Sequence, residues 1–548
     1  MAADIRVLKA RKIITMNSYR PVATHVAIRE GRILGVGSLE DVAGWGPYDL
    51  DETFANKVLM PGFVEGHSHA SEGRFWEYTY VGFQGRRDPD GRQWPGVEGI
   101  EPVVARLQAE EAKLTDPEAP LFAWGFDPIY FGGRRMEAVD LDRVSSTRPV
   151  VVLHSNGHLM NVNSVVLDRA GIDARTNIEG VTKGTDGKPT GELAEMAARF
   201  MAFRVTGNPF GTGMTGAVLR RFGQSACFVG VTTATDLHAL LDDATVETYR
   251  VATSDPAFPM RLVPAFAAVS APAAEGIAKV KRLQRTSTDK LRYGLVKVMS
   301  DGSIQGFSGR LKWPGYYNGH ANGVWNAPPS QLMELVQAYH EAGLHIHIHT
   351  NGDEASELMI DAIELALQKA PRADHRHTLQ HCQMADEAQF RRMAKLGICV
   401  NLFANHLYYW GDQHAAITMG PDRAARLDAT GTAHRLGVHY AIHSDAPVTP
   451  LAPLFTAWCA VNRRTMSGKV LGPEECLTVD QALRAITLGA AYTLKMDHLV
   501  GSIESGKFAD FAVLEDDPLS VPPEALKDVP VWGTVLSGVP FQAPPTVS

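Results

Sequence analysis

Two histidines separated by one residue follow an apolar run near the start of the chain, in the segment PGFVEGHSH at residues 61–69. If this run is a β-strand, His67 and His69 lie on one face of it, because side chains two positions apart in a strand point the same way. Two imidazoles on one face are a geometry that binds a metal ion. The alternative is a polar strand end in which each ring only forms hydrogen bonds.

Apolar runs rich in β-branched residues recur along the middle of the chain and end in polar residues. Helical patterns such as QLMELVQAYHEAG lie between several of them, with apolar residues three and four positions apart. Eight strands alternating with helices predict an α/β fold, a (β/α)8 TIM-type barrel. A doubly wound sheet is less favoured because no Gly-rich phosphate turn follows the first strand. The runs occupy residues 59–69, 229–236, 261–269, 293–302, 343–353, 376–383, 397–406 and 439–447.

The chain ends and one long connection predict two further domains. Residues 1–60 and 490–548 contain short β-patterned runs, including VAIREGRILGVG with a hairpin signal at Glu30 and Gly31, and we expect them to form one small β-sandwich domain. Residues 61–74 and 226–489 would form the barrel. Residues 75–225 are far too many for an ordinary loop, so they predict an inserted subdomain over the active-site face.

Composition narrows the class of protein. The 548 residues, 45% of them hydrophobic, suffice for a large core and more than one domain. The net charge of -8 is spread thinly, and without a basic run no nucleic-acid partner is expected. No signal core or apolar stretch of about 18 residues occurs, so we expect a cytoplasmic protein without a membrane partner. Five cysteines without a CxxC pair do not indicate a disulfide scaffold.

Polar residues at the inward ends of the eight runs are the candidates for chemistry, because barrels of this kind carry their active sites where the strands end. A single histidine there is more often a hydrogen-bonded polar residue, but six such residues on five strands favour a metal site. The six are His67, His69, Lys297, His349, His381 and Asp445. Deeper on the same faces lie His345, His347, His377 and His443, of which His347 is the alternative to His349.

Lys297 is the unusual member of this set. In VKVMSDG the two-residue period places Lys297 and Asp301 on one face. A bare ammonium group beside divalent cations would be strongly repelled. Either the lysine pairs with Asp301 and the site holds one metal, or it reacts with CO₂ to form a carbamate, which reverses its charge and can bridge two metals.

Taken in order, PGFVEGHSH, the lysine of the fourth run, HTNGD, QHCQ and HSDAPV resemble the amidohydrolase superfamily. Within it the chain is similar to the branch of YtcJ-like proteins and N-substituted formamide deformylases, along nearly its whole length, including WGFDPIYF, GKPTGELAE and GSIESGKFADFAVLEDDPL. That branch usually has a small residue at the position of His443 and a glutamate at that of Gln380.

The resemblance implies two divalent metals, most often zinc, although manganese, iron or cobalt suit the same ligands. It implies that His67 and His69 bind the more buried metal, that carboxylated Lys297 bridges, and that His349 and His381 hold the second metal. Asp445 would bind the first metal and act catalytically on protons.

The implied activity is hydrolysis of a C–N bond in an N-substituted amide or formamide-like small molecule by metal-activated water. Ester or lactone hydrolysis by the same centre stays open. Deamination also stays open, although Gly352 stands where the deaminases carry an acid and Asp353 comes one residue later. A non-catalytic, metal-loaded ligand-binding protein is the alternative from another class, and a homo-oligomer is left open. Candidate substrate-binding residues are Trp124, His158, Asp301, Asn405 and Trp410.

Overall fold

A computed structural model describes residues 4–131, 134–210 and 213–543 of the chain. These residues form two compact units. One unit contains the chain up to His69, Gly223–Ala446 and the residues from Leu451 on, and the other contains Ala70–Phe222 with Pro447–Pro450. Each unit has its own β-sheet and its own apolar clusters.

The larger unit is built on an eight-stranded parallel sheet. Its order is β20-β19-β18-β17-β16-β15-β14-β5, so neighbours in the sheet follow one another along the chain. Each of the eight runs expected from the sequence overlaps one of these strands, and seven of the runs contain their strand entirely. The strands are β5 (Phe63–Glu65), β14 (Val231–Ala239), β15 (Arg261–Ala267), β16 (Leu295–Met299), β17 (His345–Thr350), β18 (Thr378–His381), β19 (Cys399–Leu402) and β20 (Tyr440–Ile442).

The two edges of this sheet approach each other, which makes the sheet barrel-like. Directly after the edge strands β5 and β20, a parallel bridge joins Ser68 to Ala446, and the N–H of His69 donates to the carbonyl of Ala446 at 2.8 Å. Every residue of β15 and β17 is buried, as parallel strands covered on both faces require. The carboxyl ends of the first and last strands therefore lie side by side.

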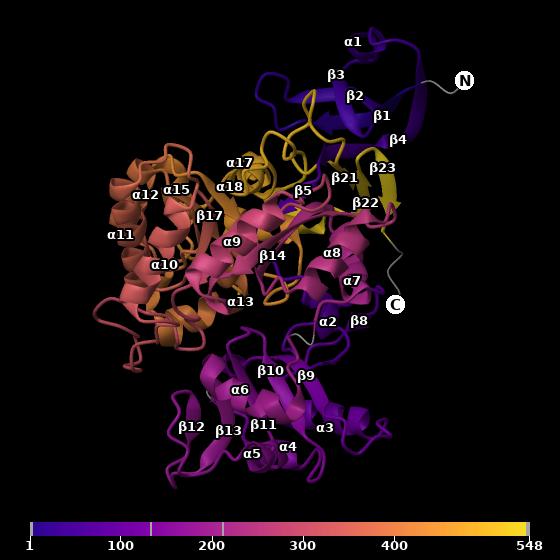
Figure 1. Cartoon of the computed structure of the whole chain (residues 1–548). Coiled ribbons are helices and arrows are strands. Elements are labelled where there is room, and N and C mark those ends of the chain that lie inside the picture. Colours follow the sequence, from indigo (N-terminus) through magenta and orange to yellow (C-terminus); the bar gives the residue numbers. More distant parts are fainter. Residues whose placement is uncertain (1–3, 132–133, 211–212, 544–548) are drawn as a thin grey trace. The chain divides into compact units, whose positions relative to one another are not determined.

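Helices connect these strands. Both α10 (Pro329–Glu341) and α11 (Asp353–Lys369) pack against each other and against β17, as Figure 1 shows. The ends of α12 (Glu387–Leu396) follow from the sequence: Asp386 and Gln389 form a capping box, and Gly397 ends the helix with a left-handed φ of 69°. No helix among the described residues is both long and apolar enough to span a bilayer.

Strands from both chain ends pair in one seven-stranded sheet, ordered β23-β22-β21-β4-β1-β2-β3 (Figure 1). The junction is the antiparallel pairing of β4 with β21, which brings indigo and yellow segments together. The two chain ends thus share one sheet, and both belong to the larger unit. A separate small β-sandwich domain built from them stays a prediction. The strands are β1 (Ile5–Ile14), β2 (Val22–Arg29), β3 (Arg32–Gly37), β4 (Tyr48–Pro61), β21 (Phe511–Leu514), β22 (Val531–Leu536) and β23 (Val539–Gln542).

The hairpin expected at Glu30 and Gly31 joins β2 and β3. Both turn residues have positive φ, 51° and 75°. A two-residue turn with two positive φ values matches the right-handed twist of the flanking strands, and glycine adopts the second one without steric cost.

The smaller unit has a six-stranded mixed sheet, ordered β12-β13-β11-β10-β9-β6. In β10 (Val150–His154), Val150 and Val152 belong to one apolar cluster while Val151 and Leu153 belong to another, so both faces of this sheet are packed. The segment 75–225 expected as an insertion falls largely within this unit, and its expected place over the active-site face stays a prediction. The other strands are β6 (Thr79–Tyr80), β9 (Leu121–Phe126), β11 (Leu159–Val162), β12 (Val181–Lys183) and β13 (Pro189–Ala194).

Candidate metal centre

The carboxylate of Asp445, which follows the last strand of the parallel sheet, lies close to His67 and His69, which follow the first strand. Its Oδ1 lies 3.3 Å from Nε2 of His67 and 3.3 Å from Nε2 of His69. Ligands bound at about 2.0–2.1 Å to a tetrahedral zinc ion lie about 3.3 Å apart. Oδ1 of Asp445 is buried and has no hydrogen-bond partner among the described residues. The three side chains therefore fit a divalent metal ion.

His349 and His381 form a second pair of nitrogen donors. Nδ1 of His349 lies 3.1 Å from Nε2 of His381, at the ends of β17 and β18. Two neutral imidazole nitrogens at this distance either share a proton or bind a common cation. The other ring nitrogen of His381, Nδ1, is buried and lies 3.9 Å from Oδ2 of Asp445. In the part of the chain that the structure describes, this nitrogen has no hydrogen-bond partner. This pair thus borders the group around Asp445.

The side chain of Lys297 ends beside His67. Its Nζ lies 3.5 Å from Nε2 of His67. Burial lowers the pKa of the Lys297 ammonium to about 7, partly offset by the charge of Asp445. Asp301 is engaged elsewhere, since its carboxylate accepts the backbone N–H groups of Asn351, Gly352 and Arg310 at 2.9–3.0 Å. Carboxylation of Lys297 stays a prediction.

A chain of hydrogen bonds orients the ring of His67. Nδ1 of His67 donates to Oε1 of Gln380 at 2.7 Å, and Nε2 of Gln380 donates to Nδ1 of His347 at 2.7 Å. Nε2 of His347 in turn donates to the carbonyl of Thr493 at 2.9 Å. The proton on Nδ1 of His67 leaves a lone pair on Nε2, the nitrogen that faces Asp445. Both ring nitrogens of His347 thus have hydrogen-bond partners, and the assignment of His349 rather than His347 as a ligand stays a prediction.

Two of the deeper histidines also have structural partners. His345 donates from Nε2 to the carbonyl of Arg376 at 2.6 Å. His377 accepts the N–H of Ile346 on Nδ1 and contacts His340 through Nε2 at 2.8 Å. These rings are satisfied inside the barrel-like sheet, as expected for buried polar groups.

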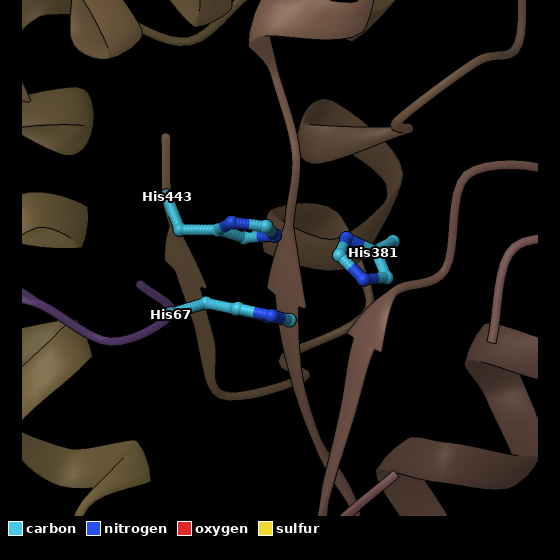
Figure 2. A group of neighbouring side chains, drawn as sticks. All are labelled: His67, His381 and His443. Atoms are coloured by element: carbon cyan, nitrogen blue, oxygen red, sulfur yellow. The ribbon is translucent and has the colours of Figure 1, made fainter. Parts of the chain in front are cut away.

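His443 behaves differently from these rings, although the sequence placed it among the deeper histidines and not among the six candidate ligands. Ligand atoms of His67, His381 and His443 all lie within 4.8 Å of one another, and Figure 2 shows the three rings. The ring of His443 stacks on that of His67, with centroids 4.6 Å apart and planes 15° apart. Its two-residue offset from Asp445 placed it on the same inward face but did not give its distance from His67.

The backbone turns sharply at two of the candidate residues. His381 and Asp445 have left-handed φ values of 65° and 52°, which are uncommon for residues with a Cβ. Such strain persists where the surroundings enforce it, often at functional sites. The turns bring the two side chains off their strand ends and toward each other.

Glu65 is a residue that the sequence reasoning missed. It is buried, and burial raises its pKa to about 8. Its Oε1 accepts the N–H of Ser444 at 3.0 Å. The residue thereby ties β5 to the turn that carries Asp445.

The candidate substrate-binding residues fall in both units, and their contact with a substrate stays a prediction. In the smaller unit, Trp124 is buried in an apolar cluster and Nδ1 of His158 lies 3.1 Å from Oε2 of Glu195. In the larger unit, Asn405 and Trp410 belong to α13 (Asn405–Gln413), and the Trp410 ring lies 5.7 Å from that of His406. Asp301 has the backbone partners given above.

Comparison with known proteins identifies the family. Residues 55–541 match the amidohydrolase family. The putative amidohydrolase YtcJ of Bacillus subtilis (strain 168) is 27% identical over 536 residues, which cover 94% of this chain and 94% of that protein. The N-substituted formamide deformylase of Arthrobacter pascens is 25% identical over 546 residues, 98% of each chain. The chain belongs to the amidohydrolase family, so the resemblance seen in its motifs is confirmed.

A solved structure shares the fold. The crystal structure of an uncharacterized metal-dependent hydrolase from Pyrococcus horikoshii OT3 superposes with a TM-score of 0.72 at 18% identity, covering 95% of this chain and 99% of that one. This likeness concerns the fold alone. With the family match, the chain is a hydrolase of the amidohydrolase superfamily whose histidine and aspartate cluster could bind a metal.

Proposed function

We propose that the protein is a metal-dependent amidohydrolase that cleaves the C–N bond of an N-substituted amide or formamide-like small molecule. The observation that carries the proposal is the position of Asp445 Oδ1, 3.3 Å from the Nε2 atoms of both His67 and His69. The relative from Arthrobacter pascens, named for its action on N-substituted formamides, supports the substrate class.

The residues that would hold the metal divide into two sets. His67, His69 and Asp445 would bind one divalent ion, and His349 with His381 would bind a second, with carboxylated Lys297 as a bridge. Zinc suits these nitrogen and oxygen donors best, and manganese, iron or cobalt would also be accepted. A bound divalent metal supplies Lewis acidity, which lowers the pKa of water and polarises a carbonyl group.

Asp445 is the proton carrier in this proposal. Its carboxylate accepts a proton from the attacking water as the water oxygen bonds to the carbonyl carbon. The C–N bond then breaks, and the same proton passes to the leaving nitrogen, which gives an amine and a carboxylic acid.

Deamination is disfavoured by the position of Asp353. Its Oδ1 accepts the backbone N–H of Lys312 at 2.8 Å, at the start of α11. Asp353, which lies one residue after the position of the acid in deaminases, thus holds the backbone of a loop at Lys312. Ester and lactone hydrolysis would use the same residues as amide hydrolysis.

A substrate panel tests the proposal. Purified protein, loaded with zinc or with cobalt, would be assayed on N-substituted formamides, N-substituted amides, esters, lactones and aromatic amines, with release of amine, acid and ammonia measured separately. We expect amine and acid to be released from formamides or amides in the metal-loaded protein alone. Release of ammonia only, or of acid from esters only, would move the assignment to the deaminase or esterase alternative. Absence of any turnover with bound metal would favour a ligand-binding protein.

A further inference from the structure

We infer that His406 accepts the N–H of the substrate amide through Nε2 and so orients the nitrogen for departure. This inference rests on the proposed function and adds a residue that binds the reacting group. His406 is the second residue of α13, which begins at Asn405, shortly after β19 ends at Leu402, so it lies at the carboxyl edge of the parallel sheet. Its ring centroid lies 6.4 Å from that of His381, a proposed metal ligand.

One nitrogen of the His406 ring is engaged and the other is open. Nδ1 lies 3.2 Å from Oδ2 of Asp428, and in the part of the chain that the structure describes the ring forms no hydrogen bond through Nε2. The nearby ring of His414 has a partner on each nitrogen, Oγ1 of Thr418 at 2.7 Å and the side-chain amide of Gln383 at 3.0 Å. His406 is therefore the ring of this pair that can bind a ligand.

Asp428 determines which nitrogen carries the ring proton. It is fully buried, and its Oδ1 also accepts the N–H of Phe403 at 3.2 Å. Burial raises the pKa of its carboxyl, and the charge of Arg463 opposes this shift. Arg463 is fully buried too, and among the described residues it donates only to backbone carbonyls, including that of Asp428 at 3.1 Å. An ionised Asp428 compensates this buried cation, holds the ring proton on Nδ1 of His406 and leaves a lone pair on Nε2.

The state of the ring decides the kind of partner. Burial lowers the pKa of His406 to about 3, and the charge of Asp445 acts in the opposite direction. The ring is therefore neutral near neutral pH. A neutral ring with its proton on Nδ1 accepts a hydrogen bond at Nε2 but cannot donate one there. The N–H of an N-monosubstituted amide is such a donor, whereas an ester or an N,N-disubstituted amide has none.

This hydrogen bond sets the geometry of C–N cleavage. After water adds to the carbonyl carbon, the nitrogen becomes tetrahedral and carries a lone pair. With its hydrogen held by His406, the nitrogen turns this lone pair toward Asp445, which gives it the proton taken from water as the C–N bond breaks. The amine leaves with its own hydrogen and the one from Asp445, and His406 neither gains nor loses a proton.

Two variants separate the roles of the two ring nitrogens. In H406N the side-chain amide N–H can replace Nδ1–H and still donate to Asp428, but no group remains at the position of Nε2. In H406Q the longer side chain places an amide oxygen near that position, where it can accept. We expect H406N to lower kcat/KM about 10-fold on the best secondary amide or formamide of the substrate panel, and H406Q to recover part of this loss.

Counterparts of that substrate without an N–H give a readout that a structural role would not produce. These are the N-methylated amide and the ester with oxygen in place of the N–H, and we expect H406N to leave kcat/KM on both unchanged. Zinc content and circular dichroism of H406N should match those of the unsubstituted protein. Equal losses on the amide and its counterparts, or no loss on the amide, would overturn the inference. If the unsubstituted protein cleaves no amide at all, the proposed function itself fails.

Discussion

Nδ1 of His67 donates a 2.7 Å hydrogen bond to Oε1 of Gln380, a residue 313 positions later in the chain. This bond fixes the tautomer that leaves Nε2 of His67 open toward Asp445. Gln380 also accepts from Nδ2 of Asn401 at 3.1 Å, so its amide is held in one orientation from two sides. The ligand is thus oriented by residues that do not themselves face the metal position.

Replacement of Gln380 by leucine should weaken metal binding about 10- to 100-fold, as loss of such supporting hydrogen bonds typically does. The leucine has a similar volume but offers no acceptor to His67. Competition between the protein and a chelator for zinc measures the effect. Unchanged zinc affinity in Q380L would show that the hydrogen bond does not orient the ligand.

Replacement of Asp445 by asparagine should lower kcat on the best substrate of the panel by about 10²- to 10⁴-fold. Asparagine keeps an oxygen near His67 and His69 but cannot carry the proton. Circular dichroism and metal content of D445N serve as controls for fold and loading. Turnover within a few-fold of the unsubstituted protein would contradict the role assigned to Asp445.

Replacement of Asp510 by alanine should destabilise the larger unit by about 3–5 kcal/mol, the usual effect of removing one partner of a buried ion pair. The carboxylate of Asp510, directly before β21, accepts from Nε and Nη2 of Arg261, the first residue of β15, at 2.7 and 3.0 Å. Urea unfolding measures the loss. The double variant R261M/D510A should recover part of it, because no unpaired charge remains buried; equal losses in both variants would argue against this cause.

Acidification should destabilise the smaller unit through His154. Burial lowers the pKa of His154 to about 4 from its ordinary value of 6.5. Below about pH 6.5, His154 binds a proton in the unfolded chain but stays neutral in the folded unit. The free energy of unfolding therefore decreases as the pH falls toward 4. At about pH 5 the loss amounts to roughly 2 kcal/mol.

The control for His154 is the variant H154Q. In the structure Nε2 of His154 donates to Oδ1 of Asn161 at 2.6 Å. The glutamine amide can replace this donor but does not titrate. Urea unfolding at about pH 7 and about pH 5, followed by hydrogen exchange of β10 and β11, gives the two stabilities. We expect a smaller difference in H154Q. The same difference in both proteins would exclude His154 as the source.

The parallel sheet, and the edge of it at which the candidate residues meet, could be predicted from the sequence. Apolar runs ending in polar residues predict strands, and the carboxyl ends of parallel strands meet at one edge. His67, His381 and Asp445 could therefore be grouped without knowing any distance. The hairpin at Glu30 and Gly31 was equally predictable, because its signal is local.

The depth of each side chain was not predictable in the same way. A two-residue period assigns His345, His347 and His349 to one face but does not say which reaches the site. That choice depends on Gln380 from the neighbouring strand and on the carbonyl of Thr493 far along the chain. The position of His443 was not predictable for the same reason, since its distance from His67 depends on how the sheet curls.

The ends of the parallel strands are proposed to bind a divalent metal. Metal analysis of the purified protein, with a crystal structure recorded at the absorption edge of the metal found, tests this most directly. We predict divalent metal bound among His67, His69, His349, His381 and Asp445, with a carbamate on Lys297. Active protein without metal, or metal bound away from these residues, would contradict it.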